Sequence, residues 1–287
     1  MDGRRGSRGP VVMTGDSLAG CRILVVEDEM LIAVLIEQIL EELRCVVVGP
    51  VAKLDAALRL ASHEALDAAI LDVSIRGGHV HPVAEQLLAR GIPFVLVDRR
   101  IPGLSVDVVR CDSEAGAYQL SRHLLEQGHR RIAALSGSRQ VTNAADRIAG
   151  YHRAMSESGL GDQVMEYYGE FSVNSGYEMT RQVLASRPLP TALLTGNNFI
   201  AVGAFRALHE AGLRVPDDIS VVTFDDLPEA NIINPFLTVV NQPAYEIGQR
   251  ATALLLDRLA NTAPPDSQEI ILPTQLIVRK SSAPPQN

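Results

Sequence analysis

Three acidic residues stand where the chain could hold a cation. Glu27 and Asp28 directly follow an apolar run at 22–26, and Asp72 ends a second apolar run at 68–71. If both runs are parallel strands, their carboxyl ends share one edge of a sheet, and we expect the three acids to converge there. Carboxylates that meet repel one another unless a cation joins them or their pKa values rise, and their oxygens suit Mg²⁺. The spacing predicts a Mg²⁺ site formed by Glu27, Asp28 and Asp72; acids on a solvated rim are the alternative.

The elements that must place these acids alternate regularly. Short apolar runs, typical of buried parallel strands, are separated by stretches of amphipathic helical spacing such as residues 30–43. The alternation continues along the chain and predicts an α/β fold of parallel sheets. The predicted strands lie at 22–26, 46–48, 68–71, 94–97, 106–109, 132–135, 164–168, 192–195 and 219–224, with two more near 268–279.

The first four strand–helix units resemble the receiver domain of response regulators. The resemblance covers residues 21–97 and rests on V-V-E-D-E, on D-A-A-I-L-D-V and on G-G-H-V-H-P-V-A-E-Q-L-L-A-R-G-I-P-F-V. It implies a flavodoxin-like segment, without the last strand–helix unit of a receiver. In that segment Asp72 would be the phospho-acceptor, and Glu27 and Asp28 would help to hold Mg²⁺.

Two positions depart from the receiver pattern. Asp98 stands where a receiver has Ser or Thr, and Arg110-Cys111-Asp112 stands where it has Lys. A fourth carboxylate beside a phosphoaspartate repels it, where a hydroxyl would donate a hydrogen bond. The departures argue against a phosphorylation-driven switch.

From about residue 94 to residue 280, the chain resembles the effector-binding core of the lactose-repressor (LacI) family. Six motifs follow one another in the family's order: V-L-V-D-R-R, L-L-E-Q-G-H-R-R-I-A-A-L-S-G, R-I-A-G-Y, G-N-N-F-I-A-V-G-A-F-R-A-L, L-R-V-P-D-D-I-S-V-V-T-F-D-D and P-F-L-T-V-V-N-Q-P. The resemblance implies a two-lobed, periplasmic-binding-protein-like (type I) core, with the receiver-like segment as the first half of its N-terminal lobe. It also implies a small effector, such as a sugar or a nucleobase.

Four residues match effector contacts of the LacI family. By the resemblance, Arg147, Asn197 and Asp225 bind the effector, and Asp98 adds a contact at the junction of the lobes. Arg, Asn and Asp also suit a polyol on chemical grounds, because they supply planar, bidentate donors and acceptors. A helix N-cap is the alternative role for Asn197, and a turn is the alternative for Asp225. Asn198 stands where the family usually has Asp.

Two lobes and two tails are predicted. The N-terminal lobe takes residues 20–110 with about 241–262, and the C-terminal lobe takes 111–240 with about 264–280. Residues 1–19, which are rich in Gly, Arg and Ser, and residues 281–287 are predicted to be disordered.

Composition narrows the classes of function. The formal charge of −8 and the pI near 5.4 argue against a protein that coats nucleic acid. Residues 1–20 are too short for a helix-turn-helix, so direct DNA binding is not expected.

Cys21, Cys45 and Cys111 lack metal-like spacing and suggest a reducing compartment. Without a secretory signal or an apolar run of the ~20 residues that span a bilayer, we expect a cytoplasmic protein that contacts no membrane. The sequence has no nucleophile elbow, Walker loop or Cys-His pair, so no enzyme is expected.

Three hypotheses for function stay open. The first is a LacI-type sensor of a sugar-like effector, without its own DNA-binding head and able to form a homodimer through the repressor-like core. The second is a phosphorelay response regulator that is phosphorylated on Asp72. The third is a recombinant or engineered hybrid with no physiological activity.

Overall fold

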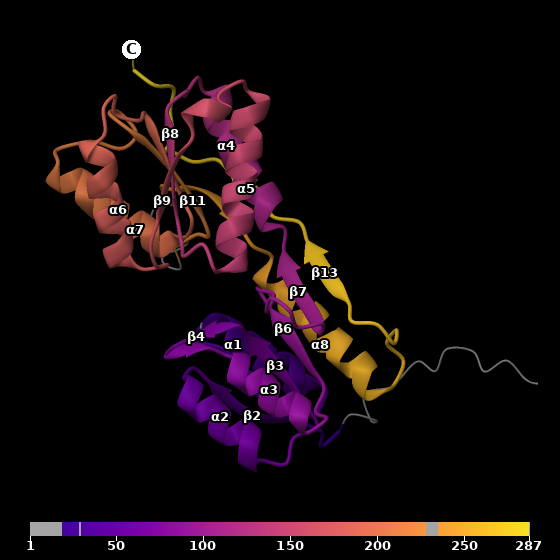
Figure 1. The fold of residues 1–287 in the computed structure, drawn as a ribbon. Helices are drawn as coiled ribbons and strands as arrows, with labels where there is room; N and C mark the ends of the chain where they lie inside the picture. The colour runs from indigo at the N-terminus through magenta and orange to yellow at the C-terminus, as the bar shows by residue number, and fades with distance from the viewer. Residues whose placement is uncertain (1–18, 29, 228–234, 287) are drawn as a thin grey trace, which may run out of the picture. The chain divides into compact units, whose positions relative to one another are not determined.

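The computed structural model of the chain contains two units, each built around a six-stranded sheet with flanking helices (Figure 1). The structure describes residues 19–28, 30–227 and 235–286. The first unit combines residues 1–109 with 244–270, and the second combines 110–243 with 271–287. Each unit is therefore assembled from segments that lie far apart in the sequence.

Two predicted boundaries differ from the structure. Residues 264–270 belong to the first unit, because the Gln268 carbonyl accepts a hydrogen bond from the Val108 N–H at 2.9 Å. The prediction of disorder at 281–287 is wrong for its described part, since Ser281 is fully buried. Its Oγ donates to the Val221 carbonyl at 2.6 Å, which ties this end of the chain to the second sheet. The predicted tail at 1–19 lies, apart from Ala19, outside the described residues.

The first sheet has the strand order β13-β7-β6-β3-β1-β2. Its strands are β1 (Arg22–Val26), β2 (Val46–Val51), β3 (Ala68–Asp72), β6 (Phe94–Val97), β7 (Asp107–Cys111) and β13 (Glu269–Leu272). Its helices are α1 (Met30–Glu42), α2 (Leu54–His63), α3 (His81–Ala89) and α8 (Ala244–Leu259). A short antiparallel ribbon of β4 (Ser74–Ile75) and β5 (Gly78–His79) follows β3.

Apolar residues explain why β1 and β3 lie in the middle of this sheet. Both strands are buried along almost their whole length, which is typical of parallel strands that helices cover on both faces. On one face, Leu24, Leu71 and Leu87 belong to a single core cluster. Helix α8 packs against β3 and β6 and also contacts α1.

The second sheet has the strand order β14-β12-β11-β10-β8-β9. Its strands are β8 (Ile132–Ser136), β9 (Met165–Tyr168), β10 (Ala192–Thr195), β11 (Ser220–Phe224), β12 (Thr238–Asn241) and β14 (Gln275–Ile277). Its helices are α4 (Ser113–Glu126), α5 (Thr142–Glu157), α6 (Val173–Ala185) and α7 (Asn198–Glu210), with a 3₁₀ turn, η2, at Gly161–Gln163. Strand β14 runs antiparallel to β12, whereas the pairs β8–β9, β8–β10, β10–β11 and β11–β12 are parallel.

Close helix pairs depend on glycine at two contacts of the second unit. Helices α4 and α5 meet at Gly150, where a Cβ would lie 2.1 Å from the Glu114 carbonyl oxygen. Helices α6 and α7 meet at Gly203, where a Cβ would lie 2.1 Å from the Val173 carbonyl oxygen. Any side chain at either glycine would force the helices apart.

The two sheets have equivalent strand orders, and in each unit polar residues follow the carboxyl ends of the parallel strands. The carboxyl ends of the parallel strands share one edge within each sheet. In the first unit this edge carries Glu27 and Asp72, and in the second it carries Asn197 and Asp225.

Candidate functional site

Arg147 is buried in the second unit, and some of its guanidinium N–H groups make no hydrogen bond to the described residues. It lies on α5, its side chain is 2% exposed, and its Nη1 donates to the Gly196 carbonyl at 2.5 Å. Within the part of the chain that the structure describes, its Nε and Nη2 atoms have no hydrogen-bond partner. Buried donors without partners are costly, so native proteins rarely keep them. The pattern is typical of a side chain that binds acceptor atoms of a ligand.

Asp225 supplies the counter-charge to this arginine. Its Oδ2 lies 3.9 Å from Arg147 Nη2, and its Oδ1 accepts a hydrogen bond from Gln242 Nε2 at 2.6 Å. The residue follows β11 in the left-handed conformation, with φ at 65°. The side chain is 27% exposed, so its carboxylate can still accept a hydrogen bond from a bound molecule. Asp225 lies in a bend directly after β11, and its carboxylate faces Arg147.

Asn197 caps α7 and adds a donor at the same edge. Its Oδ1 accepts the Ile200 N–H at 3.0 Å, so the N-cap interpretation of this residue is correct. The cap occupies the amide oxygen, and the Nδ2 group is the part that can donate to a ligand. Asn198, where the LacI pattern has Asp, donates from Nδ2 to the Asp226 carbonyl at 2.9 Å and so joins α7 to the turn after β11.

Aromatic rings flank Arg147, and the motifs did not identify them as site residues. The guanidinium carbon lies 3.7 Å from the centre of the Phe224 ring and 5.7 Å from that of Phe171. Phe224 directly precedes Asp225, so its place beside the site could have been inferred from the strand end. Phe171 follows β9, and tertiary packing brings it close to Arg147. No periodic pattern in the sequence predicts that contact. Gln242 was missed as well, although it stands in the N-Q-P motif.

Asp98, the fourth predicted ligand residue, belongs to the first unit. It follows β6 with φ at 65°, and its Oδ2 accepts a hydrogen bond from Arg99 Nε at 2.8 Å. The pKa of Asp72, in the same unit, is raised mainly by burial, and the negative charge of Asp98 raises it further.

The three acids of the first unit do converge. One carboxylate oxygen from each of Glu27, Asp28 and Asp72 can be chosen so that all lie within 4.8 Å of one another. Burial raises the pKa of Asp72 to about 7, against the opposing effect of the Arg99 charge. Burial likewise raises the pKa of Asp28. The donor set, three carboxylates at short range, fits a hard divalent cation.

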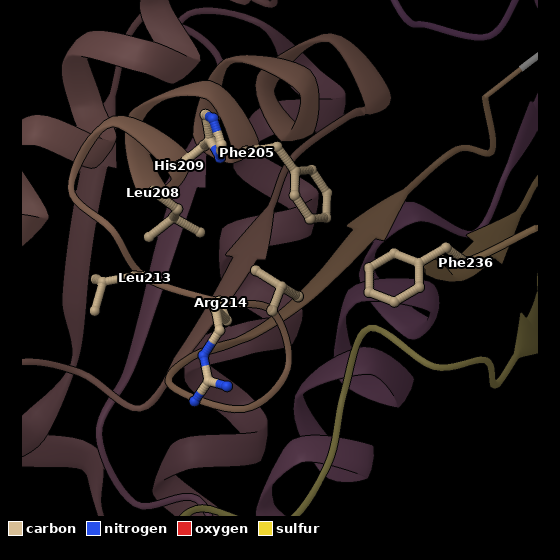
Figure 2. Close-up of a pocket in the computed structure, with 7 residues that line it drawn as sticks. Phe205, Leu208, His209, Leu213, Arg214 and Phe236 are labelled. Atoms are coloured by element: carbon tan, nitrogen blue, oxygen red, sulfur yellow. The ribbon is translucent and has the colours of Figure 1, made fainter.

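An apolar pocket of about 420 Å³ opens elsewhere on the second unit (Figure 2). Figure 2 shows Phe205, Phe236 and Arg214 among the residues that line it. The ring centres of Phe205 and Phe236 are 6.2 Å apart. None of the four predicted ligand residues lines this pocket. Its walls supply few polar groups, so the Arg147 site is the better candidate for a polar ligand.

No helix among the described residues is both long and apolar enough to cross a membrane.

Comparisons with known proteins agree with the fold and the motifs. A family model described as a periplasmic binding protein-like domain matches residues 121–282. The HTH-type transcriptional repressor PurR of Erwinia tasmaniensis is 38% identical over 198 residues, which are 68% of this chain and 57% of that repressor. The ribose operon repressor of Halalkalibacterium halodurans is 33% identical over 196 residues, 68% of this chain and 58% of that protein. The chain thus spans less than two thirds of the length of these relatives.

The fold extends the likeness over most of the chain. A LacI family transcriptional regulator from Enterococcus faecium with bound ribose matches with a TM-score of 0.77 at 28% identity. The match covers 92% of this chain and 100% of that one, so most of residues 21–97 takes part in it. Most of residues 21–97 therefore belongs to the fold that the chain shares with this regulator. The chain belongs to the periplasmic-binding-protein-like family and carries an effector-binding core of the LacI type.

Proposed function

We propose that this protein is the effector-binding part of a LacI-type transcriptional regulator and that it binds a sugar or a related polyhydroxyl metabolite. The buried Arg147 guanidinium, with unused donors beside the Asp225 carboxylate, carries the proposal. Ribose in the related regulator and the name of the ribose operon repressor support a sugar, and a nucleobase is the alternative that the LacI resemblance implies. The named relatives are repressors, and the proposal includes no enzymatic step.

The site chemistry fits a hydroxyl-rich ligand. A sugar hydroxyl can accept from Arg147 and donate to Asp225 at the same time, so both charged groups keep full hydrogen bonding. Asn197 Nδ2 offers a further donor at the same sheet edge. The flat faces of sugar rings pack on aromatic side chains, and Phe171 offers such a surface close to Arg147.

A thermal-shift screen with D-ribose, other sugars and nucleobases tests the proposal. A ligand that binds only the folded state at 100 times its Kd stabilises that state by about 2.7 kcal/mol. We expect at least one compound to raise the melting temperature of the wild type, and Asp225→Asn to abolish the rise. Asp217→Asn is the matched control, because Asp217 is exposed and forms an ion pair with Arg214. If no compound in the panel raised the melting temperature of the wild type, the proposed function would be contradicted.

The convergence of acids in the first unit favours a second candidate function. We infer a Mg²⁺ site held by Glu27, Asp28 and Asp72. By the receiver resemblance, Asp72 would then be the residue that accepts a phosphoryl group. In labelling by acetyl phosphate, the Asp72 carboxylate would take the phosphoryl group and release acetate. Labelling that needs Mg²⁺ and is lost in Asp72→Asn would support this function. A folded chain that fails both this test and the sugar screen would fit the third hypothesis, a hybrid without physiological activity.

Self-association through the second unit stays a proposal. Helix α7 exposes two apolar side chains, Phe199 at 56% and Val202 at 37%, on the described surface. We propose that a second copy covers them in a homodimer. Sedimentation equilibrium should show a dimer for the wild type and a monomer for Val202→Asp. A wild type that is monomeric at all concentrations would contradict it.

A further inference from the structure

A buried thiol is connected to the effector carboxylate through one amide side chain. Cys111, at the end of β7 and 1% exposed, donates from Sγ to Gln242 Oε1 at 3.0 Å. Gln242 Nε2 then donates to Asp225 Oδ1 at 2.6 Å, and the other oxygen of that carboxylate faces Arg147 Nη2 at 3.9 Å. All four residues belong to the second unit.

Donor and acceptor chemistry fixes the direction of every bond in this chain of contacts. An ionised carboxylate only accepts hydrogen bonds, so Gln242 must turn its NH₂ group towards Asp225. That orientation leaves the amide oxygen facing the sulfur, and the thiol must therefore donate its proton. A residue without a donor at position 111 would remove this restraint on the amide.

We propose that Cys111 is a positioning residue: its protonated thiol holds the Gln242 amide, and through it the Asp225 carboxylate, in the orientation that faces Arg147. The inference rests on the proposed effector site and adds to it a residue that no motif identified. The two buried Arg147 donors without partners indicate that a ligand enters beside the carboxylate that this chain of contacts orients. Loss of the thiol donor removes one restraint on the Gln242 amide, so that the Asp225 carboxylate that it contacts is held less firmly in this orientation and the affinity for the ligand falls.

Infrared spectroscopy tests the contact without any ligand. In a protein with Cys21→Ser and Cys45→Ala, Cys111 is the remaining thiol, and its S–H stretch reports whether the proton is hydrogen-bonded. We expect Gln242→Leu to raise the frequency of this band because the acceptor is lost; Gln242→Met serves if the leucine variant does not fold. An unchanged band in the folded variant would overturn the proposal, since the thiol would then donate elsewhere, for example to Ser113 Oγ at 3.6 Å.

Titration calorimetry with D-ribose tests the effect on binding. Cys111→Val should weaken D-ribose binding about five- to tenfold, the effect of one typical hydrogen bond, and Cys111→Ser should recover most of the loss because it keeps a donor. Equal affinities for the valine variant and the wild type would overturn the positioning role. If the wild type itself does not bind D-ribose, that result counts against the proposed sugar, and the infrared band alone then decides between a thiol bonded to Gln242 and one that is not.

Discussion

Asp98 and Asp225 have the same backbone geometry in the two units. Each follows the third strand of its sheet in the shared strand order, and each has φ at 65°. The Asp98 N–H donates to the Val109 carbonyl at 3.0 Å, and the Asp225 N–H donates to the Val240 carbonyl at 2.9 Å. A left-handed residue other than glycine is a site of backbone strain, and such strain is often found at functional sites.

Backbone strain at Asp225 can be measured by comparing two variants that both lack the carboxylate. We expect Asp225→Gly to be more stable than Asp225→Ala by about 1 kcal/mol, because a Cβ is strained in the left-handed region. Urea denaturation gives both values. At the neighbouring Asp226, whose φ is not positive, the order should reverse. A glycine variant no more stable than the alanine variant at Asp225 would show that this strain is absent.

A buried ion pair joins the two segments of the first unit. Arg258 of α8 donates to both oxygens of Asp107 on β7, at 2.6 and 2.8 Å, and Asp107 is 4% exposed. We expect Asp107→Asn to lower the free energy of unfolding by about 3 kcal/mol, because it leaves the arginine charge without its partner. Removal of the exposed Asp217 carboxylate should change stability little. Equal effects of the two substitutions in chemical denaturation would contradict the importance of the buried pair.

Two helical glycines should respond to alanine in opposite directions. At Gly203 a Cβ would clash with the α6 backbone, so Gly203→Ala should cost about 3 kcal/mol or more. At Gly248 the nearest atom to a Cβ is Ile36 Cγ1 at 3.6 Å, an ordinary contact. Gly248→Ala should therefore gain about 0.5–1 kcal/mol from helix propensity. Thermal unfolding of both variants checks this, and similar changes at the two positions would exclude the tight α6–α7 contact.

The stability of the second unit should fall in mild acid because of His129. Its ring is 1% exposed, and its nitrogens bond Thr191 Oγ1 at 2.9 Å and the Ala283 carbonyl at 3.0 Å. Burial lowers the pKa of His129 below its usual value of about 6.5, an effect that the Ala283 bond opposes. The unfolded chain thus takes up a proton as the pH falls below about 6.5 while the folded chain does not, and stability is lost from there down through the folded pKa.

Urea titrations at about pH 7.5 and about pH 5.5 measure this loss. The pH-dependent part should shrink in His129→Asn. Burial also lowers the pKa of the nearby His123. His123→Asn is therefore measured beside His129→Asn for comparison. A pH dependence of stability in His129→Asn equal to that of the wild type would contradict this role of His129.

Local apolar spacing predicted most strands of the two sheets, but β12 (Thr238–Asn241) was not among the predicted strands. The ribbon of β4 and β5 was not among the predicted strands either, because its pairing depends on contacts that spacing does not encode. The docked segment around Ser281 was missed for the same reason, since polar serines become buried only when the backbone of β11 offers them partners. At the site, the LacI resemblance pointed to Arg147, Asn197 and Asp225. Phe171, Gln242 and Cys111 reach the site through side-chain geometry, which required the structure.

We expect Arg147 to bind the effector through its Nε and Nη2 donors, which have no hydrogen-bond partner among the described residues. Isothermal titration of D-ribose into wild type, Arg147→Met and Arg153→Met tests it most directly, since Arg153 lies on the same helix and pairs with Glu114 at 2.5 Å. Two lost hydrogen bonds to a charged group predict at least about 100-fold weaker binding for Arg147→Met, with wild-type affinity for Arg153→Met. Wild-type affinity in a folded Arg147→Met protein would contradict the claim.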